Sequence, residues 1–235
     1  LVFTVSNAQT YGNLMKTVAL ISGGIDSFVA AAFEQSRGSI IFGLTVNYEQ
    51  IHKKELNSAL KIGEFLKIKE HKFIHIDLGW LPSSITDKNY IGTNHQKGIP
   101  PSYVPARNTI LISFALAYAE AIDADSIVIG VHCIDYSGYP DCRPEYIKAF
   151  QRILDIGTKK TIEGGRIELK APLIMMRKSE IIKLGFSLGL DFSITWSCYK
   201  GGLKACGICD ACRIRLEAFK KAGMPDPIEY ETNST

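Results

Sequence analysis

Short apolar runs alternate along this chain with longer stretches of helical periodicity. The apolar runs are typical of buried parallel strands and lie at 16–21, 40–47, 73–77, 126–131 and 167–170. Apolar residues recur at helical spacing in 28–33, 50–66, 108–121, 145–156 and 179–188. This alternation predicts right-handed crossovers and a Rossmann-like α/β fold, with helices on both faces of a parallel sheet.

The carboxyl ends of the predicted strands are where such sheets bind ligands. We therefore expect Ser22, Tyr48, Asp77 and His132 to cluster at that edge. The stretch 78–105 interrupts the alternation with several prolines and glycines. A segment of this length without periodicity predicts a lid over the ligand site, with disorder as the alternative.

A glycine loop, Ser22-Gly-Gly-Ile-Asp-Ser27, follows the first predicted strand. Its glycines let the backbone approach a phosphate, and the first-turn N–H groups of the next helix point toward that anion. We expect Asp26 and Ser27 to cap this helix. The Walker pattern is absent and the loop has no lysine, so the γ-phosphate grip of kinases is not indicated. An ordinary strand-to-helix turn is the alternative.

Four cysteines near the C-terminus have the spacing C-x7-C-x2-C-x2-C: Cys198, Cys206, Cys209 and Cys212. The two-residue gaps let successive sulfurs converge on one ion. Four thiolates favour Zn²⁺, with an iron–sulfur cluster as the main chemical alternative. Disulfides are the weaker interpretation, because nothing marks the chain as secreted. Four protein ligands leave no open position, so the predicted ion is structural.

Composition is that of an ordinary globular protein, with 235 residues, 46% hydrophobic and 22% charged. No apolar run approaches the roughly 20 residues of a membrane span. The net charge of +3 is too small to imply a nucleic-acid partner. We expect a nucleotide-binding domain at 15–190 and a metal-binding region at 191–235. Residues 1–14 lack a signal-peptide pattern and are interpreted as an extension: a tag remnant, a misassigned start or an added edge strand.

The glycine loop resembles the PP-loop of the ATP pyrophosphatases, which hold the pyrophosphate of ATP and adenylate a carboxylate or carbonyl oxygen. Other runs are similar to the QueC family of 7-cyano-7-deazaguanine synthases, and the resemblance extends over about 16–219. These runs are Tyr48-Glu-Gln-Ile-His52, Ser84-Ile-Thr86, Tyr103-Val-Pro-Ala-Arg-Asn-Thr109, Asp135-Tyr-Ser-Gly-Tyr-Pro-Asp-Cys-Arg-Pro-Glu145 and Trp196-Ser-Cys-Tyr199. One departure is His132-Cys133, where many relatives carry Asn-Ala. It leaves open whether His132 is a structural or a catalytic group.

The resemblance implies synthesis of a nitrile from 7-carboxy-7-deazaguanine and ammonia, with ATP adenylating first the carboxylate and then the amide. It also implies Mg²⁺ bridging the phosphates, one structural Zn²⁺, a cytoplasmic homodimer, and neither a nucleic-acid nor a membrane partner. The ATP-binding residues would be Ile21, Ser22, Gly23, Gly24, Ile25, Asp26, Ser27, Phe28, Val29, Ala30 and Ala31. The catalytic residues would be Ser22, Asp26, Arg107, Asp135, Asp141 and Arg143.

Residue types in the middle of the chain suit a deazaguanine substrate. Carboxylates accept hydrogen bonds from a guanine-like edge, phenol rings stack on the base, and guanidinium groups hold a carboxylate or a developing phosphate charge. The candidates are Asp135, Asp141 or Glu145 for the edge, Tyr136 or Tyr139 for stacking, and Arg107 or Arg143 for the anion. A turn-rich loop without function is the alternative interpretation of the 135–141 segment.

Two other functions remain open. A tRNA-modifying PP-loop enzyme could perform thiolation or amidation through Cys133 or Cys142, and it predicts a basic surface and activity lost in Cys142→Ser. A zinc-ribbon binding module without activity is the second. Some basicity near the cysteines suits such a module, but the ATP loop would then have no purpose. The basic residues are Lys200, Lys204, Arg213 and Arg215.

Overall fold

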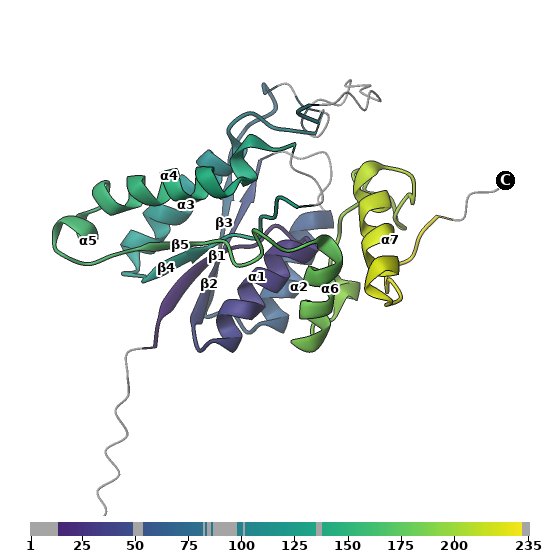
Figure 1. The fold of residues 1–235 in the computed structure, drawn as a ribbon, viewed down its shortest axis with the longest axis horizontal. Coiled ribbons are helices and arrows are strands. Elements are labelled where there is room, and N and C mark those ends of the chain that lie inside the picture. Colours follow the sequence, from purple (N-terminus) through teal and green to yellow (C-terminus); the bar gives the residue numbers. More distant parts are fainter. Residues whose placement is uncertain are drawn as a thin grey trace, which may run out of the picture.

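The computed structural model describes residues 14–48, 54–81, 83, 86, 98–100, 102–134 and 138–231. Within them, five parallel strands form one sheet in the order β3-β2-β1-β4-β5. The strands are β1 (Lys16–Leu20), β2 (Ile40–Asn47), β3 (Glu70–His75), β4 (Ser126–Val128) and β5 (Glu168–Lys170). Helices cover both faces of the sheet, so the predicted Rossmann-like fold is confirmed (Figure 1).

The helices agree with the predicted periodicity in most of the chain. They are α1 (Ile25–Ser36), α2 (Lys54–Phe65), α3 (Arg107–Ala121), α4 (Pro144–Ile156), α5 (Lys159–Ile162), α6 (Lys178–Ser187) and α7 (Asp210–Ala222), with single 3-10 turns η1 (Pro140–Cys142) and η2 (Phe192–Ile194). The short α5 and the C-terminal α7 are not predicted from the sequence. Helix α7 begins inside the cysteine motif. The residues of its first turn are therefore interpreted as part of a metal site and not as the start of a helix. Strand β3 begins three residues before its predicted start, and β4 ends three residues before its predicted end.

Helix α1 begins one residue before the predicted cap. Gly24 occupies the N-cap position, and Ile25 is the first helical residue. Asp26 and Ser27 lie in the first turn, where the Ser27 hydroxyl donates to the Gly24 carbonyl at 3.0 Å. The prediction that Asp26 and Ser27 cap the helix is therefore wrong. Their side chains remain close to the loop because the helix starts earlier.

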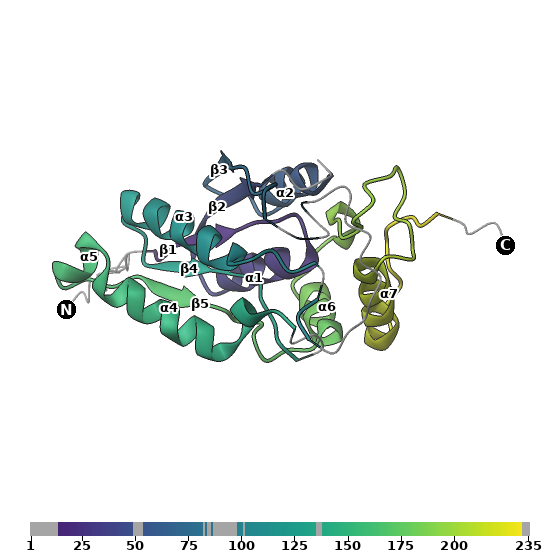
Figure 2. The same ribbon diagram turned by 90° about the horizontal axis from the view of Figure 1, so that it is seen from above.

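Helices lie against both faces of the sheet (Figures 1 and 2), and an apolar cluster fills the space on each side. Helices α3 and α4 pack on one face, and α1, α2 and α6 pack on the other. The second cluster continues into the C-terminal region, where Phe192 stacks edge-on against Phe28 and Phe219 at ring distances of 6.3 and 5.7 Å. The core therefore crosses residue 190. The division into two domains at that position stays a prediction.

A histidine fills a gap between the edge strand β3 and its neighbours. A Cβ at Gly43 of β2 would lie 2.8 Å from the His71 ring, and one at Gly63 of α2 would lie 2.5 Å from it. Thr45 bridges the ring to the end of β1, 2.8 Å from His71 Nε2 and 2.7 Å from the Ile21 carbonyl. Burial lowers the pKa of His71 to about 4, so the imidazole is neutral at physiological pH.

The stretch 78–105 is described only in part. Leu78, Leu81 and Val104 pack around Tyr48 and so anchor both ends of this stretch at the carboxyl end of β2. Residues 82, 84–85, 87–97 and 101 lie outside the described residues, as do 1–13, so the lid stays a prediction. Among the helices that the structure describes, none has the length and apolar character needed to cross a membrane.

Candidate active site

The glycine loop joins β1 to α1 and is braced by its own hydroxyl groups. Ser27 Oγ accepts from the Ser22 backbone N–H at 3.2 Å and lies 3.1 Å from Ser22 Oγ, which accepts from the Gly24 N–H at 3.3 Å. Ser22 is exposed, whereas Ser27 is buried. The amino end of α1 lies directly after the loop, and its first-turn N–H groups favour an anion bound at the loop. The loop thus has the form of a phosphate cradle.

Gly23 is held between two distant elements. Its φ of +89° favours glycine, and a Cβ would lie 2.2 Å from the Glu55 carbonyl oxygen of α2. The Trp196 N–H donates to the Gly23 carbonyl at 3.0 Å. The loop is therefore packed directly against α2 and against the segment that leads to the first motif cysteine.

The remaining residues predicted to bind ATP lie below the loop. Ile21, Ile25, Phe28, Val29, Ala30 and Ala31 are each at most 1% exposed. Their side chains belong to the apolar layer around α1, so they support the loop from the core.

A lysine from α6 supplies the positive charge that the loop itself lacks. Lys178 Nζ lies 2.6 Å from both carboxylate oxygens of Asp26. The lysine side chain is 13% exposed and the Asp26 side chain 22% exposed. The two residues are 152 positions apart, so no spacing in the sequence points to the pair. The apolar periodicity of 179–188 predicts a helix there. Only the fold shows that Lys178, the first residue of α6, contacts Asp26.

His132 also reaches Asp26, from the far end of β4. Its Nε2 lies 3.8 Å from Asp26 Oδ2. Tyr48 accepts a hydrogen bond from Arg107, and Asp77 accepts from the Gly79 N–H at 2.8 Å in an exposed turn. The expected cluster of Ser22, Tyr48, Asp77 and His132 therefore stays a prediction.

Arg107 starts α3 and lies against the phenol of Tyr48. One guanidinium nitrogen donates to the Tyr48 hydroxyl at 3.3 Å, and the guanidinium carbon lies 5.8 Å from the ring centre. Burial raises the pKa of Tyr48, so the phenol is neutral when it accepts this bond. Within the described residues, the Arg107 guanidinium has no carboxylate at ion-pair distance. Its remaining N–H donors match the oxygens of a bound anion.

Asp141 orders the backbone next to Arg107. Its carboxylate accepts from the Asn108 N–H at 3.0 Å, and the Asn108 side chain donates to the Asp141 carbonyl at 3.2 Å. Asp141 is 6% exposed. The carboxylate thus satisfies the first turn of α3, where a negative charge is favourable. In this arrangement Asp141 positions Arg107, and direct contact with a base edge stays a prediction.

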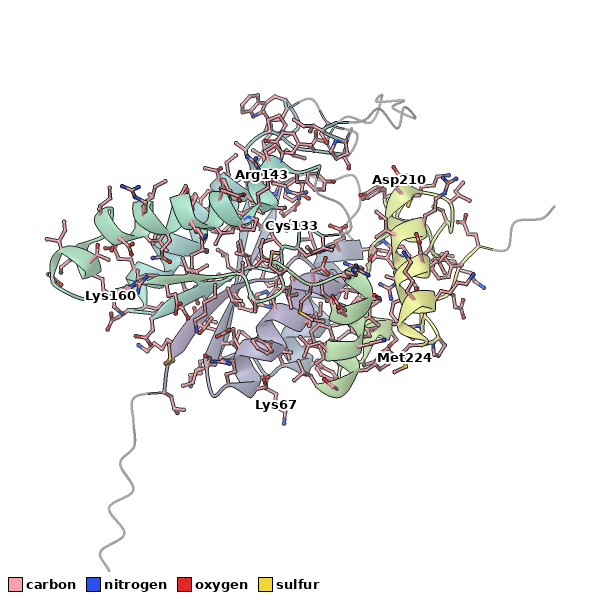
Figure 3. All side chains as sticks on the ribbon, in the orientation of Figure 1. Lys67, Cys133, Arg143, Lys160, Asp210 and Met224 are labelled. Atoms are coloured by element: carbon pink, nitrogen blue, oxygen red, sulfur yellow. The ribbon has the colours of Figure 1, made fainter. Side chains whose placement is uncertain are left out.

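Arg143 lies at the start of α4, where its Nε donates to the Pro140 carbonyl at 3.1 Å and the rest of the side chain is exposed (Figure 3). Tyr139 precedes η1, and its hydroxyl lies 2.6 Å from Ser102 Oγ. Burial raises the pKa of Tyr139, so this phenol also stays neutral. Asp135 and Tyr136, the other candidates for this loop, lie outside the described residues.

The two cysteines outside the motif have different surroundings. Burial and the nearby Asp141 carboxylate raise the pKa of Cys142 to about 12. Its sulfur accepts from the Asn108 side chain at 3.4 Å. The thiol of Cys133 donates to the Ile174 carbonyl at 3.1 Å (Figure 3). A buried thiol that remains protonated is a poor nucleophile, so Cys142 does not suit the thiolation chemistry.

The four motif cysteines converge as their spacing predicts. Their sulfurs all lie within 4.8 Å of one another, and Cys206 Sγ is 3.9 Å from Cys212 Sγ. A tetrahedron with Zn–S bonds of about 2.3 Å has sulfur–sulfur edges of about 3.8 Å. The backbone N–H of Cys206 donates to Cys198 Sγ at 3.3 Å, and that of Cys209 donates to Cys206 Sγ at 3.4 Å. These bonds favour thiolates, so the donor set fits a metal ion.

A buried ion pair ties this cluster to the rest of the fold. The Arg215 guanidinium from α7 donates to both Asp226 carboxylate oxygens, at 2.8 and 2.9 Å. It also donates to Thr195 Oγ1 at 2.8 Å and to the Phe192 carbonyl at 3.3 Å. Asp226 accepts a further bond from the Tyr230 hydroxyl at 2.6 Å. Helix α7, the segment before Cys198 and the C-terminal tail are thereby joined.

The cluster also contacts α2 near the loop. Lys54 Nζ lies 4.1 Å from the Trp196 ring centre and donates to the Leu203 carbonyl at 2.6 Å. The Trp196 ring nitrogen in turn donates to the Cys198 carbonyl at 2.9 Å. The residues around the first motif cysteine therefore support one wall of the glycine loop.

Comparison with known proteins gives a family match over most of the chain. The family model described as queuosine biosynthesis protein QueC matches residues 16–223. A 7-cyano-7-deazaguanine synthase of Nostoc sp. is 47% identical over 223 residues, covering 92% of this chain and 97% of that protein. One of Coxiella burnetii is 46% identical over 224 residues, covering 93% of this chain and 99% of that protein.

Solved structures resemble the chain more distantly. The NMN synthetase of Francisella tularensis has a TM-score of 0.46 and 18% identity, covering 90% of this chain and 78% of that one.

Proposed function

The chain belongs to the QueC family of enzymes, and we propose on that basis that it converts 7-carboxy-7-deazaguanine and ammonia into 7-cyano-7-deazaguanine with ATP. The observation that carries the proposal is the phosphate cradle with the Lys178–Asp26 pair beside it. Its relatives of 45–47% identity, named for this product, match nearly their whole length. The loop thus supports the use of ATP, and the family membership supports the identity of the base.

Two activations are needed in this reaction, because a carboxylate must lose both of its oxygens to become a nitrile. Neither hydroxide nor oxide is a viable leaving group near neutral pH, whereas AMP is. The first adenylation lets ammonia form the amide, and the second lets the amide oxygen depart as AMP. Both steps use the same loop, because the chain has a single motif of this kind.

The chain's own groups divide this work. Ser22 and the first-turn N–H groups of α1 hold the phosphates, and Lys178 adds positive charge where the negative charge of pyrophosphate develops. The guanidinium of Arg107 holds the substrate carboxylate during the first adenylation. When bound, Mg²⁺ neutralises phosphate oxygens, which suit this hard cation.

The base would be recognised by the loops that meet near Arg107. Tyr139 would stack on the ring, and the carboxylates of Asp135 or Asp141 would accept from its N1–H and amine. Arg143, which is exposed at the start of α4, would contact the substrate or the leaving phosphate.

The four-cysteine cluster would hold one structural Zn²⁺. The sulfur spacing and the backbone N–H bonds to sulfur support this choice. Elemental analysis should give one zinc per chain. Iron with a visible charge-transfer band would instead indicate an iron–sulfur cluster.

Other parts of the proposal rest on the family alone. We expect a cytoplasmic homodimer that binds neither nucleic acid nor membrane directly. The proposed division into an ATP-binding domain at 15–190 and a zinc-binding region at 191–235 follows instead from the positions of the glycine loop and the four cysteines.

The product ratio tests the reaction. With ATP, ammonia and the carboxy-deazaguanine, each nitrile should be accompanied by two AMP and two pyrophosphate, and no ADP should form. The amide should appear as an intermediate and should itself be a substrate without ammonia. Chromatography of the nucleotides with mass spectrometry of the base measures all of these. One ATP per nitrile would contradict the double adenylation.

Variants of the loop test the site. Ser22→Ala and Asp26→Ala should abolish both half-reactions while the protein stays folded, because these side chains belong to the cradle and not to the core. Ser36→Ala is the matched control, since Ser36 is exposed at the other end of the same helix. A Ser22→Ala protein that still converts amide to nitrile would show that the second activation occurs elsewhere.

A further inference from the structure

His132 lies at the phosphate loop, and the proposed reaction gives it no role. The chain reaches this position through Gly130, which follows β4 and passes directly over the first turn of α1. A Cβ at Gly130 would lie 2.4 Å from the Asp26 carbonyl carbon and 2.5 Å from the Ser27 nitrogen. This approach of two backbones sets the His132 ring beside the Asp26 carboxylate, with Nε2 3.8 Å from Oδ2. Packing of the β4 end on α1 therefore builds the contact.

Three ionisable side chains meet there with little exposure to water. The side chains of His132 and Lys178 are each 13% exposed, and that of Asp26 is 22% exposed. Charges in such surroundings interact more strongly than at the surface. Lys178 already contacts both oxygens of Asp26. With a neutral imidazole, the Lys178 ammonium is compensated by the carboxylate that it contacts.

Two thiols lie beside this cluster in the described part of the chain. Cys142 of η1 lies within the electrostatic reach of Asp26, and its raised pKa keeps it neutral. Cys133, the neighbour of His132, donates to the Ile174 carbonyl. Imidazole is the side chain whose ordinary pKa lies closest to neutrality, so His132 is the group considered for a change of charge.

A nucleoside triphosphate brings several negative charges beside this pair, and negative charge favours the protonated form of a neighbouring imidazole. We propose that His132 takes up a proton when the triphosphate binds, so that an imidazolium holds Asp26 and leaves Lys178 available to the phosphates. His132 acts through Asp26 and is thus a positioning residue. The inference rests on the proposed function, because it assumes that the loop receives the phosphates of ATP.

Calorimetry of nucleotide binding tests this coupling. The probe is an ATP analogue with a methylene bridge between the α and β phosphorus atoms, together with Mg²⁺. Titrations in buffers of different ionisation enthalpy, at pH values around the ordinary histidine pKa of about 6.5, give the number of protons taken up. The wild-type protein is compared with His132→Asn, which keeps a polar side chain without a titratable ring. His75→Asn is the matched control, because His75 ends β3, two strands away from β1.

The wild-type protein and the His75→Asn variant should take up a fraction of a proton more than His132→Asn. Protonation of the analogue itself is common to all three proteins and cancels. The affinity of the wild type should also strengthen as the pH falls, by up to about tenfold per pH unit for one fully linked proton. His132→Asn should show a shallower dependence.

Equal proton uptake in all three proteins would overturn the inference. A decrease in proton uptake in the His75→Asn variant as large as that in His132→Asn would overturn it too. If His132→Asn fails to fold, the NMR signals of the His132 ring in the wild-type protein, followed against pH, test the inference instead. The pKa of His132 should rise when the analogue binds, and an unchanged value overturns the inference. Failure of every protein to bind the analogue would instead refute the ATP site itself.

Discussion

Replacing Arg215 by methionine should destabilise the C-terminal region, because the Asp226 carboxylate would remain buried without its positive partner. The Arg215 side chain is 1% exposed and that of Asp226 is 5% exposed. The substitution removes both bonds to Asp226 and those to Thr195 and Phe192. Asp226 still accepts from the Tyr230 hydroxyl and from the Ile228 N–H.

Removal of one partner of a buried ion pair costs about 3–5 kcal/mol, because the other charge remains buried. The two donors left on Asp226 place the expected loss at the lower end, about 3 kcal/mol. For a chain of this size, that loss lowers the melting temperature by about 6–12 °C. Metal release to a chelator should also accelerate, because Cys212 lies on the same helix, α7.

Thermal unfolding of the metal-loaded protein measures the loss of stability. Arg213→Met is the matched control, since Arg213 is exposed on the same helix and should change stability by less than about 0.5 kcal/mol. Adding Asp226→Asn to Arg215→Met should cost less than the sum of the single changes, by about 1 kcal/mol or more. A loss below about 1 kcal/mol in Arg215→Met, or strictly additive costs, would refute the reasoning.

Two further predictions concern His71 and Cys142. The His71 pKa is lowered from 6.5 to about 4, so the neutral ring stabilises the fold fully above about pH 6.5, and this stability is lost as the pH falls toward 4. After a discount for partial exposure the loss is about 1–2 kcal/mol, measurable by denaturant unfolding across this range, and His71→Asn should remove this pH dependence. Cys142→Ser should keep nitrile formation within about twofold in a steady-state assay, because a thiol with a pKa of about 12 supplies almost no thiolate at neutral pH. Loss of turnover with an intact fold would instead favour the thiolation alternative.

Most of the fold follows from local pattern. Apolar runs and helical periodicity predict the five strands and five of the helices, because burial of one face is encoded at spacings of a few residues. Helix α7 is missed, since its first turn carries the metal motif and its apolar residues begin late. The start of β3 is also missed, because this edge strand is largely exposed and carries polar residues.

Local motifs determine the chemistry of the two candidate sites. The glycine loop and the four cysteines are contiguous or closely spaced, so their residue types and intervals already define a phosphate cradle and a metal cluster. The resemblance of the chain to the QueC family predicts the substrate and the reaction. What each motif contacts is not encoded in its own spacing.

Tertiary structure alone decides which charges meet at the loop. Lys178 and Asp26 are 152 residues apart, and Gly130 brings His132 to the same carboxylate through backbone packing. Arg107 likewise meets Tyr48 because parallel strands align the ends of distant segments. Such contacts depend on the order and register of the strands. Sequence periodicity determines which face of each element is buried, whereas the position of one element beside another follows only from packing the whole core.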